Sequence, residues 1–444
     1  MKNIILIAAI FVLTTSVPGA EEQALVIYAI QGARIVPVSG ATIESGTIVF
    51  RDGVITAVGS SVTPPAGAQV IAGKGLTVYP GLIDMGSTTG LDMPAVPRAD
   101  NPRTTEDVER VKADYLLRAH FRAADHVNPT ATALARIAAN GITAVLATPS
   151  GDAIRGQSAL INTALGDDEP QIGAVADERK GAMVVKTPVA LHVTFSEQPA
   201  GGNAYPNSLM GVIAFVRQAF LDAQHWNSIQ GKRVVPRPVY EPAYEAMQPA
   251  LAGRLPVAFE GESAREIVRA LDMARSFKLD PIITNARESD QVAADLKAAN
   301  ARVIVSLNYP TRPQNLAPDA DEPLRTLRAR ANAPKAPAAL VKAGVPFAFA
   351  SAGLNEPRDF IRNAAKAVQN GLSREDALKS LTLQAATIAG AADRVGSLEP
   401  GKMANLLVTE GDLFDDKMTI KHVFVEGRPV NLEAAAPPGN RRGQ

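Results

Sequence analysis

Short apolar runs that alternate with helical patterns constrain the fold of this chain most. Six runs rich in Val, Ile, Ala and Phe are separated by longer segments whose apolar residues have helical spacing. This alternation is typical of a parallel sheet with crossover helices. It predicts an α/β fold, either a (β/α)8 barrel or a doubly wound sheet, and the absence of G-x-G-x-x-G after the first run favours the barrel. The runs are 143–147, 189–193, 256–259, 281–283, 303–305 and 346–349.

Helices are expected between these runs, and three of them end at a residue followed by glycine, as helices often do. The segments with helical spacing are 106–126, 130–140, 209–230, 264–277, 291–299, 338–343 and 359–370.

Both ends of the chain carry short β-branched runs instead. Residues 24–79 and 398–430 have this character, and Arg51-Asp52-Gly53 is a hairpin signal. We predict a small composite β-sandwich domain built from residues 21–79 and 396–432, beside a barrel of residues 80–395. The Ala, Pro, Gly and Arg content of 433–444 predicts a disordered tail.

Residues 1–20 have the layout of a secretory signal peptide. Lys2 precedes an apolar stretch over 4–12, and a small-residue segment follows, which places cleavage at Gly19 or Ala20. We therefore expect export across the inner membrane to the periplasm. No later apolar run reaches ~18 residues, so no membrane span is expected after signal removal.

Composition excludes several classes of function. The chain has no cysteine, which excludes disulfides, thiol catalysis and Cys-ligated zinc. Lys plus Arg and Asp plus Glu number 45 each. This balance gives no electrostatic case for a nucleic-acid partner.

Three segments resemble the imidazolonepropionase-like branch of the amidohydrolase superfamily. They are Val78-Tyr-Pro-Gly-Leu-Ile-Asp84, residues 341–351, and Asp393-Arg-Val-Gly-Ser-Leu-Glu-Pro-Gly-Lys402. The resemblance implies a (β/α)8 barrel with a composite β-sandwich. It also implies metal-dependent hydrolysis of carbon–nitrogen bonds other than peptide bonds.

The family's metal ligands lie at the carboxyl ends of the barrel strands, and this chain substitutes those positions. The two histidines expected after the first strand fall on Gly86 and Thr88. The histidine expected after the sixth strand falls on Asn285, and the aspartate expected after the eighth falls on Ala352. Neutral oxygens bind zinc poorly without carboxylate or imidazole partners. We therefore expect no metal cofactor, and a ligand pocket lined by these four residues and Glu197.

Carboxylates are the candidates for a rebuilt site. Glu260 and Glu262 follow the expected fifth strand two residues apart, so they point to the same side. With Asp84, and with Glu197 beside them, they would suit Ca²⁺ or Mg²⁺ or form a metal-free acid/base pair. The alternative interpretation is structural: Glu262 or the next residue caps a helix, and Glu260 pairs with Arg287 or another base.

Two further polar features have ordinary interpretations. His192 lies within a predicted strand, where a lone histidine is more often packed than a ligand. Residues 150–156 contain two glycines that would let backbone amides approach an anion, but their spacing is not that of a P-loop. We interpret this segment as a loop.

Two functions remain open. The first is a degenerate hydrolase that binds a small amide-type ligand, or that assembles with itself or with a catalytically complete relative. The second is an active hydrolase of carbon–nitrogen bonds that uses Glu260, Glu262 and Asp84.

Overall fold

The computed structural model describes residues 26–94, 104–130, 132–163, 183–195, 205–230, 232, 240–317 and 319–435. The predicted signal peptide, Glu197 and residues 436–444 lie outside these ranges. The first residues of the predicted tail, from 433 to 435, belong to the short 3-10 helix η5 (Leu432–Ala435), which lies against helix α2 (Thr132–Ala139).

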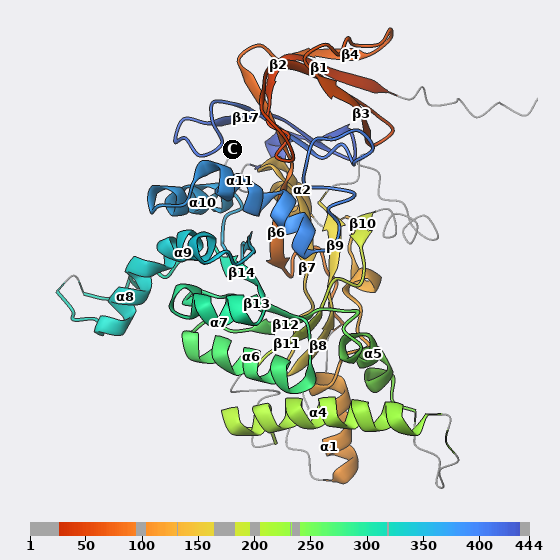
Figure 1. The fold of residues 1–444 in the computed structure, drawn as a ribbon, viewed down its shortest axis with the longest axis vertical. Helices are drawn as coiled ribbons and strands as arrows, with labels where there is room; N and C mark the ends of the chain where they lie inside the picture. Colours follow the sequence, from red (N-terminus) through yellow and green to blue (C-terminus); the bar gives the residue numbers. More distant parts are fainter. Residues whose placement is uncertain are drawn as a thin grey trace, which may run out of the picture.

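The two ends of the chain meet in one eight-stranded sheet at one end of the molecule (Figure 1). Strand β16 pairs antiparallel with β5, so C-terminal strands extend a sheet that N-terminal strands begin. Phe50 and Phe424 pack edge to face at 4.9 Å in its core. The strands are β1 (Ile27–Ile35), β2 (Ile43–Arg51), β3 (Val54–Gly59), β4 (Gln69–Ala72), β5 (Leu76–Pro80), β16 (Leu406–Glu410), β17 (Thr419–Val425) and β18 (Arg428–Pro429).

Two smaller sheets form the middle of the molecule. The order in the first is β10-β9-β7-β6, and the order in the second is β15-β14-β13-β12-β11-β8. Their strands are β6 (Leu82–Ser87), β7 (Ile142–Ala147), β8 (Ile154–Gln157), β9 (Ala159–Asn162), β10 (Val184–Lys186), β11 (Leu191–Val193), β12 (Val257–Glu260), β13 (Pro281–Thr284), β14 (Arg302–Ser306) and β15 (Phe347–Ala350).

The prediction of parallel strands is confirmed for part of this array only. Strands β11 to β15 pair parallel with one another, and β6 pairs parallel with β7. Strands β8 and β9, separated by Ser158 alone, run antiparallel to β11 and β7. The interpretation of 150–156 as a loop is therefore wrong for its last residues, which lie in β8. One nearly continuous segment joins the two sheets.

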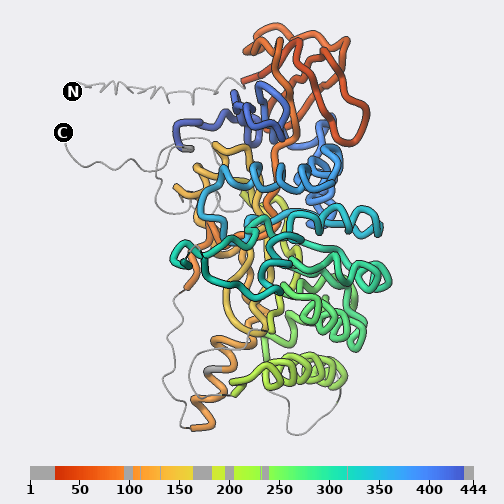
Figure 2. Tube along the Cα trace, turned by 90° about the vertical axis from the view of Figure 1, so that its left-hand side faces the viewer, coloured from red at the N-terminus to blue at the C-terminus, as the bar shows by residue number. Residues whose placement is uncertain are grey.

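Helices cover one side of the strand array. Figure 2 shows the helices coloured from green to blue on that side, and the orange and yellow segments on the other. Helices α1 and α4 lie at the end opposite the terminal sheet (Figure 1). The remaining α-helices are α1 (Thr105–Val111), α4 (Leu209–Ile229), α5 (Pro242–Leu251), α6 (Ala264–Phe277), α7 (Ala293–Ala298), α8 (Leu324–Asn332), α9 (Ala336–Ala343), α10 (Asp359–Gln369), α11 (Arg374–Leu381) and α12 (Leu383–Ile388). The shorter elements are the π-helix η1 (Lys112–Leu116) and the 3-10 helices η2 (Ala123–His126), η3 (Ser289–Val292) and η4 (Ala333–Lys335).

The predicted helix over 106–126 is wrong beyond Leu116. The chain there leaves the helix and pairs with β8, through bridges from Leu117 to Ile154 and from Arg122 to Gln157. These backbone hydrogen bonds to a distant strand replace those that a continued helix would make.

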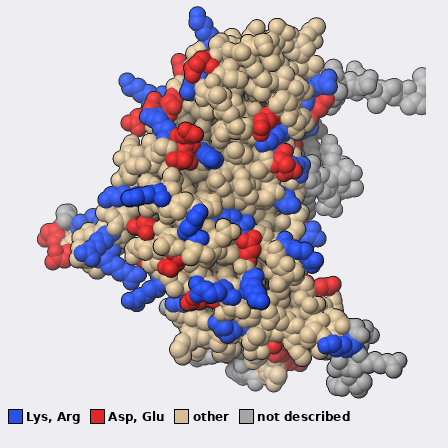
Figure 3. All heavy atoms as spheres, viewed as in Figure 1, with Lys and Arg blue, Asp and Glu red and all other residues tan. Residues whose placement is uncertain are grey.

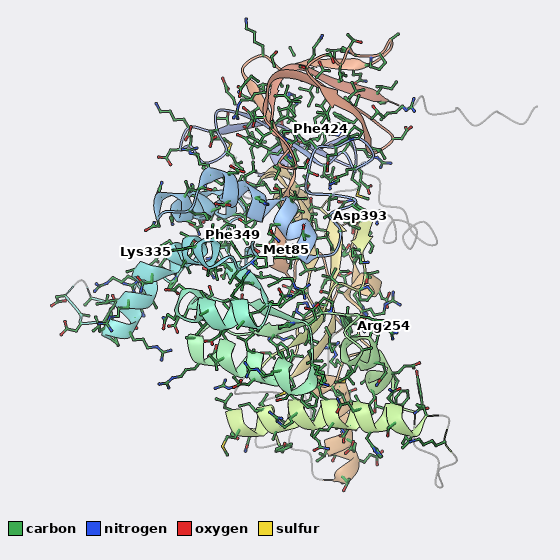
Figure 4. The ribbon with its side chains drawn as sticks, viewed as in Figure 1. Met85, Arg254, Lys335, Phe349, Asp393 and Phe424 are labelled. Carbon is green, nitrogen blue, oxygen red and sulfur yellow. The ribbon has the colours of Figure 1, made fainter. Side chains whose placement is uncertain are left out.

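Alanine and large aliphatic or aromatic side chains fill the interior. Met85 and Phe349 lie among the central strands, whereas Phe424 lies in the terminal sheet (Figure 4). On the face drawn in Figure 3, basic and acidic side chains are interspersed. Within the described residues, no helix has the length and apolar character needed to cross a bilayer.

Candidate functional site

A cavity of about 460 Å³ lies where several central strands end. The carboxyl ends of β6, β13 and β15 contribute to it, together with Arg155 of β8 and His192 of β11. It extends to Arg136 on α2 and to Phe360 at the start of α10. In open α/β sheets and barrels, ligands bind at this end of the strands.

Asp84 lies on the wall of the cavity, at the junction of β6 and β15. Its side chain is buried, and Oδ1 accepts hydrogen bonds from the backbone N–H groups of Gly86 (3.1 Å) and Ser351 (2.8 Å). No strand ladder joins β6 to β15 in the part of the chain that the structure describes. The carboxylate therefore links the ends of these two strands, together with a backbone hydrogen bond of 3.4 Å from the N–H of Ala352 to the carbonyl oxygen of Gly86.

Burial also gives Asp84 an unusual acidity. Desolvation raises the pKa of this carboxyl from 3.8 to about 6, although hydrogen bonds from Ser351 and Gly86 oppose the rise. Among the described residues, no basic side chain forms an ion pair with it.

Glu260 is held by two partners. Nη2 of Arg155 donates to one carboxylate oxygen at 2.6 Å, and Nδ2 of Asn285 donates to the other at 2.8 Å. Burial alone would raise the pKa of Glu260, but the Arg155 charge and the hydrogen bonds from Thr194 and Asn285 hold it below its usual value. This glutamate is therefore an ionised structural acceptor at neutral pH.

Glu262 makes a different contact. Its carboxylate pairs with Nη1 of Arg287 at 2.5 Å, and the side chain is 55% exposed. Helix α6 begins with a capping box between Ser263 and Glu266. Arg287 therefore pairs with Glu262 and Arg155 with Glu260, and neither glutamate lines the cavity.

The four substituted ligand positions all line the cavity: Gly86, Thr88, Asn285 and Ala352. Asn285 and Ala352 both have left-handed backbone conformations, with φ of 59° and 43°. The structure thus brings these four positions together in the lining of one cavity, and their role in ligand binding stays a prediction.

Arg155 and His192 also line the cavity, although neither was among the predicted pocket residues. Arg155 was assigned to a loop, although its strand brings it to the cavity. His192 is 5% exposed, and its Nε2 has no hydrogen-bond partner among the described residues. Burial, and then the neighbouring Arg155 charge, lower the pKa of His192 to about 3. In the sequence, only the position of His192 within an apolar strand could have pointed to its place at the cavity.

The residues present do not fit the metal that the resemblance implies. No group of three His, Cys, Asp or Glu side chains converges in the described residues. Asp84, on the cavity wall, already accepts two backbone hydrogen bonds. Glu260 lies outside the lining and is bound by Arg155 and Asn285. His192 stands alone as an imidazole donor in the lining, and one nitrogen with neutral oxygens is a poor set for zinc.

Residues 250–430 match the model of the amidohydrolase family. This match covers less than half of the chain, and it supports the predicted resemblance to the amidohydrolase family over these residues. The assignment to the imidazolonepropionase-like branch stays a prediction. No curated protein sequence matches the chain.

Solved structures of the superfamily share the fold. An amidohydrolase from Thermotoga maritima MSB8 superposes with a TM-score of 0.72 at 24% identity, covering 91% of this chain and 99% of its own. A putative prolidase from Bifidobacterium longum gives 0.52 at 18% identity, covering 94% and 96%. A prolidase complexed with N-methylphosphonate-L-proline gives 0.51 at 16% identity, covering 91% and 99%. At these identities the likeness concerns the fold alone.

Proposed function

We propose that this protein is an exported, degenerate amidohydrolase whose cavity binds a small amide-type ligand without a catalytic metal. One observation carries the proposal: the positions that hold metal ligands in the family line a real cavity here, but they supply glycine, threonine, asparagine and alanine. We propose that the central strands form an amidohydrolase barrel in which β8 and β9 together make a reversed third strand. We propose that the terminal sheet is the composite domain.

The polar groups of the cavity support binding rather than hydrolysis. Arg155 lines the cavity and is ion-paired at 2.6 Å with Glu260, which lies outside the lining, so neither is free to move a proton during a reaction. A small cavity with a few oriented polar groups is typical of a ligand site.

Asp84 favours a second candidate, a metal-free hydrolase of carbon–nitrogen bonds. A carboxyl group with a pKa of about 6 beside a cavity is suited to general acid/base work near neutral pH. The carboxylate cluster of the sequence prediction then reduces to this one residue, because Glu260 and Glu262 are both ion-paired with arginines and both lie outside the lining.

Elemental analysis of the purified mature protein separates these proposals from ordinary family chemistry. We expect no stoichiometric zinc, iron or manganese. About one such metal per chain, removed by chelation with loss of hydrolytic activity, would overturn both.

Ligand binding is tested by thermal shift with a panel of small amides, cyclic imides and ureas. Gly86→Leu should abolish any stabilisation, because a Cβ at Gly86 meets only Ala350 at 3.4 Å and the rest of the side chain enters the cavity. Gly40→Leu is the matched control, since a Cβ there meets nothing within 4 Å. If a ligand still stabilises Gly86→Leu, the ligand binds elsewhere.

The second candidate is supported if the wild-type protein hydrolyses a member of the panel and Asp84→Asn does not.

Association with a second copy or with a catalytically complete relative is proposed as well. Pull-down from the periplasm should recover one of the two, and recovery of neither would remove this part of the proposal.

A further inference from the structure

Helix α8 projects from the molecule, and none of its residues is buried. Figure 1 shows it at the edge of the fold, beyond α9, and its main neighbour is the short helix η4. Leu324 and Leu327 are 60% and 44% exposed, and they are two of the three strongly exposed leucines among the described residues. Leucines scattered singly on a surface are ordinary, but these two lie one turn apart on the same face of a helix. The described residues therefore leave an apolar patch on the outer face of α8 uncovered.

The charged side chains around this patch form two groups of opposite sign. Asp319 and Asp321 precede the helix, whereas Arg325 and Arg328 lie within it, and all four are exposed. None of the four forms an ion pair or a side-chain hydrogen bond within the part of the chain that the structure describes. Figure 3 shows acidic side chains at the tip of the projection and basic side chains along it. Negative charge therefore lies at the N-terminal end of the patch, and positive charge lies along the helix.

Glu322 holds these two groups in a fixed relation. Its side chain is 6% exposed and accepts hydrogen bonds from Arg330 at 2.6 and 3.1 Å, and it pairs with Arg312 at 3.6 Å. These contacts tie the segment before α8 to the helix itself. A surface that is already ordered loses less entropy when it binds a partner.

The charge pattern selects the partner. When two copies of α8 pack antiparallel about a two-fold axis, the leucines meet in the centre, and the acidic end of each copy lies beside the arginines of the other. An anionic lipid surface would attract the arginines but repel Asp319 and Asp321. The chain also has no net charge to draw it to such a surface.

We propose that α8 is the surface through which two copies of this chain associate. Leu324 of one copy packs against Leu327 of the other, and Arg328 lies beside Asp321 of the second copy. This proposal rests on the self-association included in the proposed function and names the surface that carries it. The patch is small, so the association is weak and depends on protein concentration.

Sedimentation velocity of the mature protein tests the apolar contact, over concentrations from about 1 μM to about 0.5 mM. We expect a monomer–dimer equilibrium that Leu327→Asp weakens by at least about tenfold, because the variant places a charge in the contact. Leu221→Asp is the matched control, since Leu221 is 46% exposed on α4 and should leave the equilibrium unchanged. Circular dichroism confirms that both variants are folded.

A charge exchange tests the antiparallel arrangement independently. Arg328→Glu alone and Asp321→Arg alone should each weaken the dimer by at least about tenfold, because like charges then meet across the two-fold axis. An equimolar mixture of these two variants should associate as the wild type does, since both contacts between the unlike copies again join opposite charges. A mixture that associates no better than the single variants would overturn the arrangement.

The outcomes separate this proposal from the function on which it rests. If wild type dimerises and Leu327→Asp does not weaken the dimer, self-association stands and α8 is the wrong surface. If wild type stays monomeric throughout, both the α8 interface and self-association fail, whereas the thermal-shift test of ligand binding is unaffected. If monomeric wild type instead binds phosphatidylglycerol vesicles and Leu327→Asp does not, α8 faces a membrane and the proposal is overturned.

Discussion

The group of strands from β12 to β15 and the group from β6 to β10 both supply residues to the cavity, but their ladders differ. The parallel pairs from β12 to β15 run without a register shift. The pairs β6–β7, β9–β10 and β8–β11 all contain shifts, including one between His192 and Val193. Asp84, Arg155 and His192 come from these irregular strands or from their border with the regular ones.

The difference separates scaffold from site. The regular strands are buried on both faces and repeat one pairing geometry, so they hold positions such as Asn285 in place. Bulges and shifts re-aim side chains, and they are enriched beside functional sites. The unusual polar groups of the cavity therefore belong to the half whose backbone departs from regular pairing.

Removal of a core side chain from the regular half should have the largest effect. Phe349 is fully buried and packs against Phe347 at 5.3 Å. Phe349→Ala should lower the free energy of unfolding by about 3–5 kcal/mol through lost burial and the cavity left behind. Urea denaturation measures it, and a loss below about 1 kcal/mol would show that this half is not the rigid scaffold.

Asp84→Asn tests the junction between the two halves. The carboxyl has a raised pKa in the folded protein, so the folded state binds more protons than the unfolded state between pH 3.8 and about 6. Stability contributed by the protonated form is therefore lost as pH rises through this window. A rise of this size corresponds to about 3 kcal/mol.

Denaturant unfolding of wild type and Asp84→Asn across pH 3.5 to 7.5 checks this sign. The variant lacks this titration. The free energy of unfolding of wild type minus that of Asp84→Asn should therefore fall as pH rises, and it should become constant above about pH 6.5. If this difference instead rises with pH, an unrecognised cation stabilises the carboxylate.

Gly156→Ala tests the irregular half. Gly156 has φ of 120°, and a Cβ there would lie 2.6 Å from the carbonyl oxygen of Phe121. We expect a loss of about 2 kcal/mol or more, since a strained backbone and a backbone clash combine. Gly32→Ala is the control, with positive φ but no neighbour within 4 Å. Thermal unfolding should rank Gly156→Ala as clearly worse.

The two glutamates offer the smallest and most selective test. Glu260→Gln leaves the half-buried Arg155 without its anion and should cost about 1–3 kcal/mol. Glu262→Gln removes an exposed pair and should cost less than about 1 kcal/mol. Equal costs would remove the distinction between a partly buried ion pair and an exposed one.

The sequence predicted what local rules decide. The helix expected over 264–277 agrees with α6, because Ser263 and Glu266 cap it and its apolar periodicity is strong. The left-handed Gly344 ends α9 as expected. Strands β7 and β11 to β15 were recognised because each is a short buried apolar run, whereas β8, β9 and β10 were not predicted.

Long-range pairing accounts for what was missed. The segment after Leu116 has helical character, but backbone bonds to β8 decide its structure. From the sequence, Gly156 could have allowed a backbone amide to approach an anion. In the structure, glycine is required at this position because a Cβ would lie 2.6 Å from the carbonyl oxygen of Phe121. The partner of Glu260 lies 105 residues away, and no local pattern selects Arg155 among the many arginines.

The pairing of β5 with β16 has a consequence for synthesis on the ribosome. The ribosome makes β5 (Leu76–Pro80) more than three hundred residues before β16, the C-terminal strand with which β5 pairs. During that interval the nascent chain exposes an apolar strand edge of the kind that recruits other chains. Chaperone contact with this segment, and insoluble product from any message truncated before residue 406, follow from where the two ends meet.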